Sequence, residues 1–245
     1  MSLCCAGITD ASRFAREYLS SLGIATEDSP GPDVGEVLLD VPSFEAEGIL
    51  RGGRPLEDLA LREDIQIYGG NLQSLPGKFR DRTDFLQDPL YLAENAAITA
   101  DAAVSLMEKQ KLPGAPLLIL GWGRIGKCLA RKLRELGADV TVAARKETDR
   151  AMLKALGYHS ADPVFLRDSL HHYKGIVNTV PALLLGKEEL EPCTGFKMDL
   201  ASRRGLEGDD VLWARGLPGK YAPEASGALI ARTFLRLRKE LPSWN

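Results

Sequence analysis

Three glycines at the spacing G-x-G-x-x-G, Gly121, Gly123 and Gly126, stand between an apolar run and a helical pattern. In a strand–turn–helix unit, the first glycine permits a tight turn, the second lets the backbone approach a diphosphate, and the third lets the helix pack closely on the strand. Free N–H groups and the positive end of the helix dipole then face the diphosphate. The pattern predicts a dinucleotide site, with a purely structural glycine turn as the alternative. The predicted contacts in this loop are Gly121, Trp122, Gly123, Arg124, Ile125 and Gly126.

Basic residues follow the second apolar run, where many dinucleotide sites carry an acid. Ala144 cannot accept hydrogen bonds from the ribose hydroxyls, and Arg145 and Lys146 come next. An acid there would repel a 2′-phosphate, whereas a guanidinium can bind it through two hydrogen bonds. We therefore predict NADP in preference to NAD, with Ala144, Arg145 and Lys146 as cofactor contacts. The alternative is that Arg145 is a solvated base and that apolar contacts hold the adenosine.

Polar residues also end two later apolar runs, at the edge where a parallel sheet places its ligands. The first run ends in Asn178, Thr179, Val180 and Pro181, which can line the ribose of the nicotinamide half. A capped strand end followed by a proline turn is the alternative for this group. The second run ends in Asp199, Ala201, Ser202 and Arg203. We expect both groups at the carboxyl edge of one sheet, with Ala201 and Ser202 as further cofactor contacts.

The elements that must position these residues alternate regularly from Pro116 onward. A parallel sheet with helices on both faces is the fold that such an alternation predicts. The strands are expected at 117–120, 139–143, 175–179 and 196–200, and the helices at 124–136 and 148–156. The fold class is therefore α/β, with a Rossmann-type domain that carries the dinucleotide site.

The first 85 or so residues predict a smaller α/β domain with short strands. The strands are expected at 3–6, 36–42 and 65–68, and a helix capped by Thr9 or Asp10 at 11–22. Asp88 and Pro89 begin an alanine-rich helix to about residue 111, which is long enough to connect two domains.

An amphipathic pattern at 224–241 predicts a terminal helix that packs back on the first domain. We therefore expect an N-terminal domain at 1–88 completed by this helix. Residues 89–223 would form the linker helix and the NADP-binding domain.

Composition narrows the function classes. Hydrophobic residues make up 44% and charged residues 27% of 245, as in ordinary globular chains, and the net charge of -3 gives no positive field for nucleic acid or an anionic membrane. The longest apolar runs are too short to span a membrane, and no secretion signal is apparent. The four cysteines include adjacent Cys4 and Cys5, which is not a zinc spacing, so we expect no metal site, buried thiols and a cytoplasmic protein.

Several motifs resemble known enzyme families. "GWGRIG" is similar to the glycine loop of D-2-hydroxyacid dehydrogenases, and this suggests that Arg124 also faces the phosphates. A narrower resemblance, to the A subunit of dipicolinate synthase, covers about residues 90 to 235. It is carried by "NAAITADAAVSLM" (95–107), "VTVAAR", "IVNTVPALLL" (176–185), "MDLASRRG" (198–205) and "GLPGKYAPEASGALIA" (216–231). The chain looks shorter than that family's members in its first domain, and "GITDAS" replaces a glycine-rich turn near residue 8.

The resemblance implies an NADP-dependent oxidoreductase that makes pyridine-2,6-dicarboxylate from a cyclic dihydrodipicolinate-type precursor. It also implies a role in the forming spore with a flavoprotein-like B subunit as partner, and we expect a homo-oligomer. Arg203 falls near the place of a carboxylate-binding arginine, although Arg204 is adjacent. Lys220, in "LPGKYAP", is expected near the nicotinamide, where it could hold a carboxylate or polarise an imine nitrogen; a surface lysine is the alternative. The predicted catalytic residues are Arg203, Lys220 and Asp199.

Two other functions remain open. A D-2-hydroxyacid or imino-acid dehydrogenase would act on a different substrate, and a non-catalytic dinucleotide-binding protein would keep only the cofactor domain. A hydroxyacid dehydrogenase usually has a histidine acid/base after the last strand of the sheet. The three histidines here, His159, His171 and His172, all precede that point, and Pro223-Glu224 occupies the comparable place. We interpret the histidines as surface residues.

Overall fold

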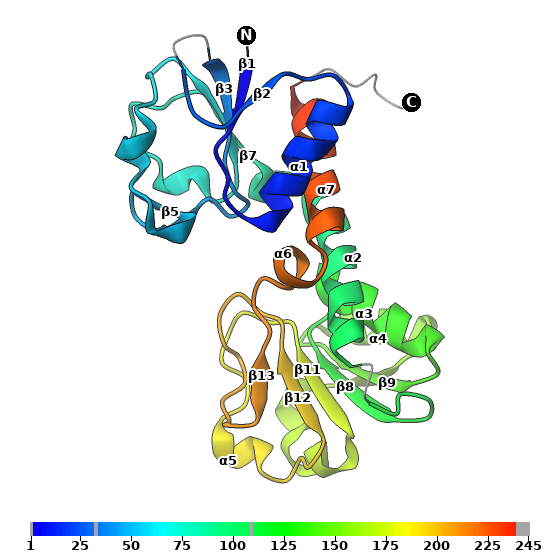
Figure 1. The fold of residues 1–245 in the computed structure, drawn as a ribbon. Helices are drawn as coiled ribbons and strands as arrows, with labels where there is room; N and C mark the ends of the chain where they lie inside the picture. The colour runs from blue at the N-terminus through cyan, green and yellow to red at the C-terminus, as the bar shows by residue number, and fades with distance from the viewer. Residues whose placement is uncertain (1, 32–33, 108–109, 239–245) are drawn as a thin grey trace. The chain divides into compact units, whose positions relative to one another are not determined.

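The computed structural model describes residues 2–31, 34–107 and 110–238. The chain divides into two compact units, one of Met1–Asn95 with Pro218–Asn245 and the other of Ala96–Leu217 (Figure 1). The first division falls inside helix α2 (Pro89–Leu106), and the second inside helix α6 (Leu217–Tyr221). Both units contain a parallel sheet with helices, so the predicted α/β class is confirmed. Among the described residues, no helix is both long enough and apolar enough to cross a bilayer.

The first unit contains a five-stranded parallel sheet in the order β2-β1-β3-β6-β7 (Figure 1). Its strands are β1 (Ser2–Cys5), β2 (Thr26–Glu27), β3 (Val34–Leu38), β6 (Gln66–Gly69) and β7 (Arg82–Asp84). A separate antiparallel pair joins β4 (Phe44–Ala46) to β5 (Ile49–Leu50). The strand expected at 36–42 is thus shorter than predicted, because the chain leaves the sheet at Leu39 and directs Asp40 to the turn after β1.

Helices α1 (Asp10–Ser21) and α7 (Pro223–Leu237) pack against each other within the first unit. Thr9 caps α1, since its side chain accepts a hydrogen bond from Ser12 N. A Cβ atom at Gly227 would lie 2.6 Å from Ala11 O, so this glycine permits the close approach of the two helices. Phe234 packs edge-on against Tyr68 of β6, with ring centroids 4.8 Å apart. Residues 239–241 of the predicted terminal helix lie outside the described part of the chain, as do 108–109 of the predicted linker helix.

The second unit contains a six-stranded parallel sheet in the order β10-β9-β8-β11-β12-β13 (Figure 1). Its strands are β8 (Pro116–Leu120), β9 (Asp139–Ala143), β10 (His159–Ala161), β11 (Gly175–Asn178), β12 (Phe196–Asp199) and β13 (Val211–Trp213). Its helices are α3 (Arg124–Glu135), α4 (Glu147–Ala155) and α5 (Lys187–Leu190), and α2 contributes its second half.

Both faces of this second sheet are buried. Leu117 and Ile119 of β8 belong to one apolar cluster, and Leu118 and Leu120 belong to another. A strand covered on both faces reads as a continuous apolar run, which is what "LLIL" does. This central strand therefore gives the glycine turn that follows it a rigid base.

The cysteines are free thiols. Cys4 and Cys5 are buried in β1, and burial raises the pKa of the Cys4 thiol to about 11 and that of Cys5 to about 12. Cys193 is also buried, and Cys128 is half-buried. Since the thiolate is the reactive form, Cys4 and Cys5 behave as small apolar residues of the core.

Candidate functional site

Gly121 and Gly126 are required by packing inside the protein. Gly121 has φ 102, in the left-handed region, and a Cβ there would lie 2.6 Å from Val180 Cγ2 and 2.7 Å from Thr179 Oγ1. A Cβ at Gly126 would overlap the carbonyl oxygen of Gly121. The turn after β8 therefore contacts both the start of α3 and the segment after β11.

Gly123 is different, because no atom of the described residues fills the space beside it. It precedes α3 with φ -80 and ψ -170, which any residue can adopt, and a Cβ there would meet no heavy atom within 4 Å. No side chain caps α3 with a hydrogen bond. The first backbone hydrogen bond of the helix runs from Lys127 N to the Gly123 carbonyl oxygen, at 3.0 Å. The N–H groups of the first turn therefore lack an acceptor within the helix. This arrangement suits a diphosphate.

Two side chains around the turn pack against the core, and a third is an exposed cation. Trp122 and Ile125 pack against the core cluster of the second unit, and Trp122 meets Tyr158 edge-on at 5.8 Å. Arg124, the first residue of α3, is exposed, and it makes no ion pair with any described residue. It is therefore available to a ligand at the helix start.

The segment after β9 presents two exposed cations. Ala144 is buried in the core cluster, so its methyl group faces the interior, whereas Arg145 and Lys146 are exposed. Arg150 of α4 fixes this segment, since its Nη1 donates to the carbonyls of Ala144 and Arg145 at 2.8 Å each. Arg150 was not among the residues predicted from the sequence, although its place in the first turns of an amphipathic helix was a usable signal.

The segment after β11 is folded on itself by Asn178, whose side chain is fully buried. Its Nδ2 donates to Val180 O, and its Oδ1 accepts from Val180 N, both at 2.9 Å. The Thr179 hydroxyl donates to Leu120 O at 2.9 Å, which joins this segment to the end of β8. Pro181 follows. The predicted residues 178–181 and the glycine turn are therefore brought together.

Asp199, at the end of β12, is fully buried and accepts four hydrogen bonds. One donor is the side-chain amide of Asn178, at 3.0 Å, and the others are backbone N–H groups at 2.6–3.0 Å, from Ala201, Gly205 and Leu206. A carboxylate bonded in this way fixes the loop after β12 and connects it to β11. Its geometry is that of a residue that positions its neighbours.

The remaining predicted residues are exposed. Ser202 and Arg203 lie in the loop that Asp199 holds, whereas Ala201 is buried. Lys220 is exposed in α6 and belongs to the first unit, so it is not grouped with Arg203. His159, His171 and His172 are also exposed, and the last two directly precede β11, at the amino end of that strand. This agrees with their interpretation as surface residues.

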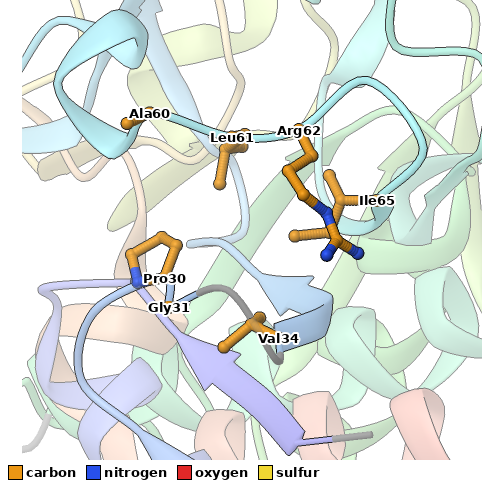
Figure 2. A pocket seen from close by; sticks show the side chains of 7 residues that line it. All are labelled: Pro30, Gly31, Val34, Ala60, Leu61, Arg62 and Ile65. Atoms are coloured by element: carbon orange, nitrogen blue, oxygen red, sulfur yellow. The ribbon is translucent and has the colours of Figure 1, made fainter.

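A small pocket of about 180 Å³ lies in the first unit. Its lining residues are Pro30, Gly31, Val34, Ala60, Leu61, Arg62 and Ile65 (Figure 2). Val34 begins β3 and Ile65 precedes β6, so the pocket is at the amino ends of these strands. Ligands of parallel sheets bind at the carboxyl ends, and a pocket of this size is small for a dinucleotide. The candidate site is the carboxyl edge of β8, β9, β11 and β12, where the open start of α3 and the segments after these strands lie.

Comparison with known proteins finds a dipicolinate synthase subunit and dehydrogenases of similar fold. No protein-family model matches the chain. The curated A subunit of dipicolinate synthase from Bacillus subtilis is 24% identical over 242 residues, covering 88% of this chain and 81% of that protein. A crystal structure of the A subunit of dipicolinate synthase from Bacillus halodurans matches with a TM-score of 0.81, at 21% identity, over 96% of each chain.

The likeness extends to dehydrogenases with other substrates. The structure of a Salmonella D-lactate dehydrogenase matches with a TM-score of 0.61, at 15% identity, over 100% of this chain and 98% of that one. The fold is thus shared with these dehydrogenases. The resemblance to the A subunit of dipicolinate synthase, indicated by the motifs of this chain, is confirmed.

Proposed function

We propose that this chain is an NADP-dependent oxidoreductase of the dipicolinate synthase A type, which makes pyridine-2,6-dicarboxylate from a dihydrodipicolinate-type ring. The observation that carries the proposal is the open start of α3, with unpaired N–H groups beside Gly123 and free cations after β9. The choice of substrate rests on the resemblance to the A subunit of dipicolinate synthase.

The residues around α3 fit a dinucleotide phosphate. The first-turn N–H groups and Arg124 would hold the diphosphate, and Arg145 with Lys146 would hold the 2′-phosphate of NADP. Neither Arg145 nor Lys146 pairs with an acid in the described ranges, so no internal carboxylate competes for them. Arg150 holds the carbonyl of Arg145, which limits the ordering entropy lost on binding. Bound NADP would supply a hydride acceptor.

The dihydropyridine ring must lose a hydride and a proton to become aromatic, so one NADP is reduced and one proton is released per turnover. The chain's part is to orient the ring, and Arg203 is the proposed carboxylate-binding cation. Asp199 would act as a positioning residue, since its four hydrogen bonds hold the loop that carries Arg203. Lys220 belongs to the other unit, and its proposed role, to polarise the ring nitrogen, rests on the family resemblance alone.

Steady-state kinetics with NADP and dihydrodipicolinate test the proposal, with NADPH formation as the readout. The assay is run with and without a flavoprotein-like partner, because the family resemblance includes such a partner. Turnover with the ring substrate, but not with 2-hydroxy acids, is expected. Turnover of hydroxy acids alone, or cofactor binding without any turnover under both conditions, would overturn it.

Variants then separate substrate binding from cofactor binding. Arg203→Met should raise KM sharply or abolish turnover while NADP affinity is unchanged. Lys220→Met should act mainly on kcat if the ammonium polarises the ring nitrogen in the transition state. Lys154→Met, an exposed lysine in the last turn of α4, is the matched control. Wild-type kinetics in both site variants would remove Arg203 and Lys220 from the site.

A further inference from the structure

Trp213, the last residue of β13, has two arginine side chains over its ring. The Cζ atom of Arg204 lies 5.1 Å from the ring centroid, and that of Arg215 lies 6.0 Å from it. The indole is fixed, because its Nε1–H donates to Ala201 O at 3.1 Å. Trp213 is 37% exposed, and both arginines are exposed. One anchored ring therefore holds two guanidinium groups beside the loop after β12.

These guanidinium groups have no acid to neutralise them within the described residues. Neither Arg204 nor Arg215 forms an ion pair, and Arg203 beside them forms none either. Three acids of this region are engaged elsewhere. Asp209 pairs with Lys187 at 2.6 Å, Asp210 pairs with Lys197 at 2.5 Å, and Asp199 accepts four hydrogen bonds.

A guanidinium that lies over an aromatic face keeps its in-plane N–H groups for other acceptors. Two cations at one ring make the local potential positive, which favours an anion that bonds to either of them. A carboxylate suits them because it accepts two parallel hydrogen bonds from one guanidinium. The bonds from Ala201 and Trp213 join this cluster to the Asp199 loop, which lies at the ligand-binding edge of the sheet.

We propose that Arg204 and Arg215, held by Trp213, form a carboxylate-binding subsite for a planar ring dicarboxylate. The choice of a ring dicarboxylate rests on the proposed function, whereas the anion site itself rests on the cluster. Arg204 and Arg215 touch the ligand, and Trp213 is a positioning residue that acts through them.

The probes are pyridine-2,6-dicarboxylate and pyridine-2-carboxylate, titrated by calorimetry against the whole protein with NADP present. Arg204→Met and Arg215→Met should each weaken binding of the dicarboxylate about tenfold or more, since each removes charge-assisted hydrogen bonds. The double variant should lose most of the preference for the dicarboxylate over pyridine-2-carboxylate, because the subsite for the additional carboxylate is then missing. Arg131→Met, an exposed arginine of α3, should bind both probes like the wild type.

Two variants of Trp213 test the positioning role. Trp213→Phe keeps an aromatic face but loses the bond to Ala201 O, so its affinity for the dicarboxylate should fall less than that of a variant without the face. Trp213→Leu removes the face and should lose as much affinity as an arginine variant. Equal losses in the two variants would show a structural role only and would overturn the assignment of Trp213.

Failure of this proposal is distinguishable from failure of the proposed function. The subsite is wrong if the wild type does not bind the dicarboxylate, or if both arginine variants bind it as Arg131→Met does. If the wild type binds the probe through these arginines but does not oxidise dihydrodipicolinate, the subsite stands and the proposed reaction falls.

Discussion

Helices α1 and α3 start at equivalent places in the two sheets, and only one of these starts is open. Each helix follows the strand at which the strand order reverses, since β1 lies between β2 and β3, and β8 lies between β9 and β11. This reversal point is where open α/β sheets bind their ligands. The two units therefore offer the same architecture for an anion, and the difference must come from particular residues.

The start of α1 is occupied by the protein's own carboxylate. Asp40 accepts hydrogen bonds from Ile8 N at 3.0 Å, from Thr9 N at 3.1 Å, and from the hydroxyls of Thr9 and Ser12 at 2.5 Å each. A Cβ at Gly7 would lie 2.9 Å from Asp40 Oδ1, so no room remains in the turn. The helix start is satisfied internally, and we expect no external anion there.

The register of the strands identifies the residue that makes the difference. Leu38 pairs with Cys5 at the end of β3, and Asn178 pairs with Leu120 at the end of β11. Two residues after each pair come Asp40 and Val180. An acid at this position closes the helix start, and an apolar residue leaves it open. A helix N-terminus at a reversal point thus predicts an anion site only when the neighbouring strand supplies no acid.

Asp40→Ala would remove the internal carboxylate at the start of α1, and we expect the largest effect from this change. It would leave four donors without their acceptor, and Ser12 among them is buried. We expect the free energy of unfolding of the first unit to fall by about 3–4 kcal/mol, measured by urea denaturation. NADP affinity should not change. Asp81→Ala, an exposed acid before β7, is the control; equal loss in both variants would contradict the internal-anion account.

Gly123→Val would block the start of α3. The branched side chain would occupy the space in which the diphosphate must lie, while its Cβ would meet no described heavy atom within 4 Å. Affinity for NADP and NAD should fall together by at least about 100-fold, or about 2.7 kcal/mol, in calorimetric titrations. Stability should change by less than about 1 kcal/mol, since only a glycine N-cap is lost. Normal binding by this variant would show that the turn is only structural.

Arg145→Glu tests which dinucleotide the site at the start of α3 prefers. It replaces a phosphate-binding cation by an acid, so NADP affinity should fall by about 1.5–3 kcal/mol, roughly tenfold to over a hundredfold. NAD affinity should stay or rise, because an acid can accept bonds from the ribose hydroxyls. Arg131→Glu on α3 controls for net charge. Equal affinities of the wild type for NADP and NAD would rule the preference out.

The turn and helix at the start of α3 could be predicted from the sequence, because the residues that indicate them are close together in the chain. The apolar run 117–120, the glycine spacing and the helix after Gly123 fall within a few residues of one another, and the structure places each as expected. The closed side was not predictable, because Asp40 lies 31 residues from Thr9 in the chain and sits inside what reads as a buried strand. Only the sheet register brings the two together.

Short elements and side-chain directions also escaped prediction. Strands β2, β5 and β7 have two or three residues each, which is too short for an apolar alternation to appear. The polar residue types at the strand ends indicated a site, but not their roles. Asp199 is predicted from the sequence as a catalytic residue, and only its four hydrogen bonds, three from its own loop and one from Asn178, indicate a positioning role.

We expect the smallest effect when an acid is introduced at the start of α3, in the position that Asp40 has near α1. Val180→Asp would place an acid after β11 at the position that Asp40 has after β3, next to Gly121. The carboxylate would be stabilised by the start of α3 and would repel a diphosphate there. We expect affinity for NADP and NAD to fall about tenfold alike, by calorimetry, since both carry the same diphosphate. In Val180→Asn the new side chain has about the size of the aspartate without its charge. This variant should bind NADP and NAD within about threefold of wild type. A loss in Val180→Asn as large as in Val180→Asp would mean that packing against Gly121, and not an internal anion, decides whether a helix start in this fold is open.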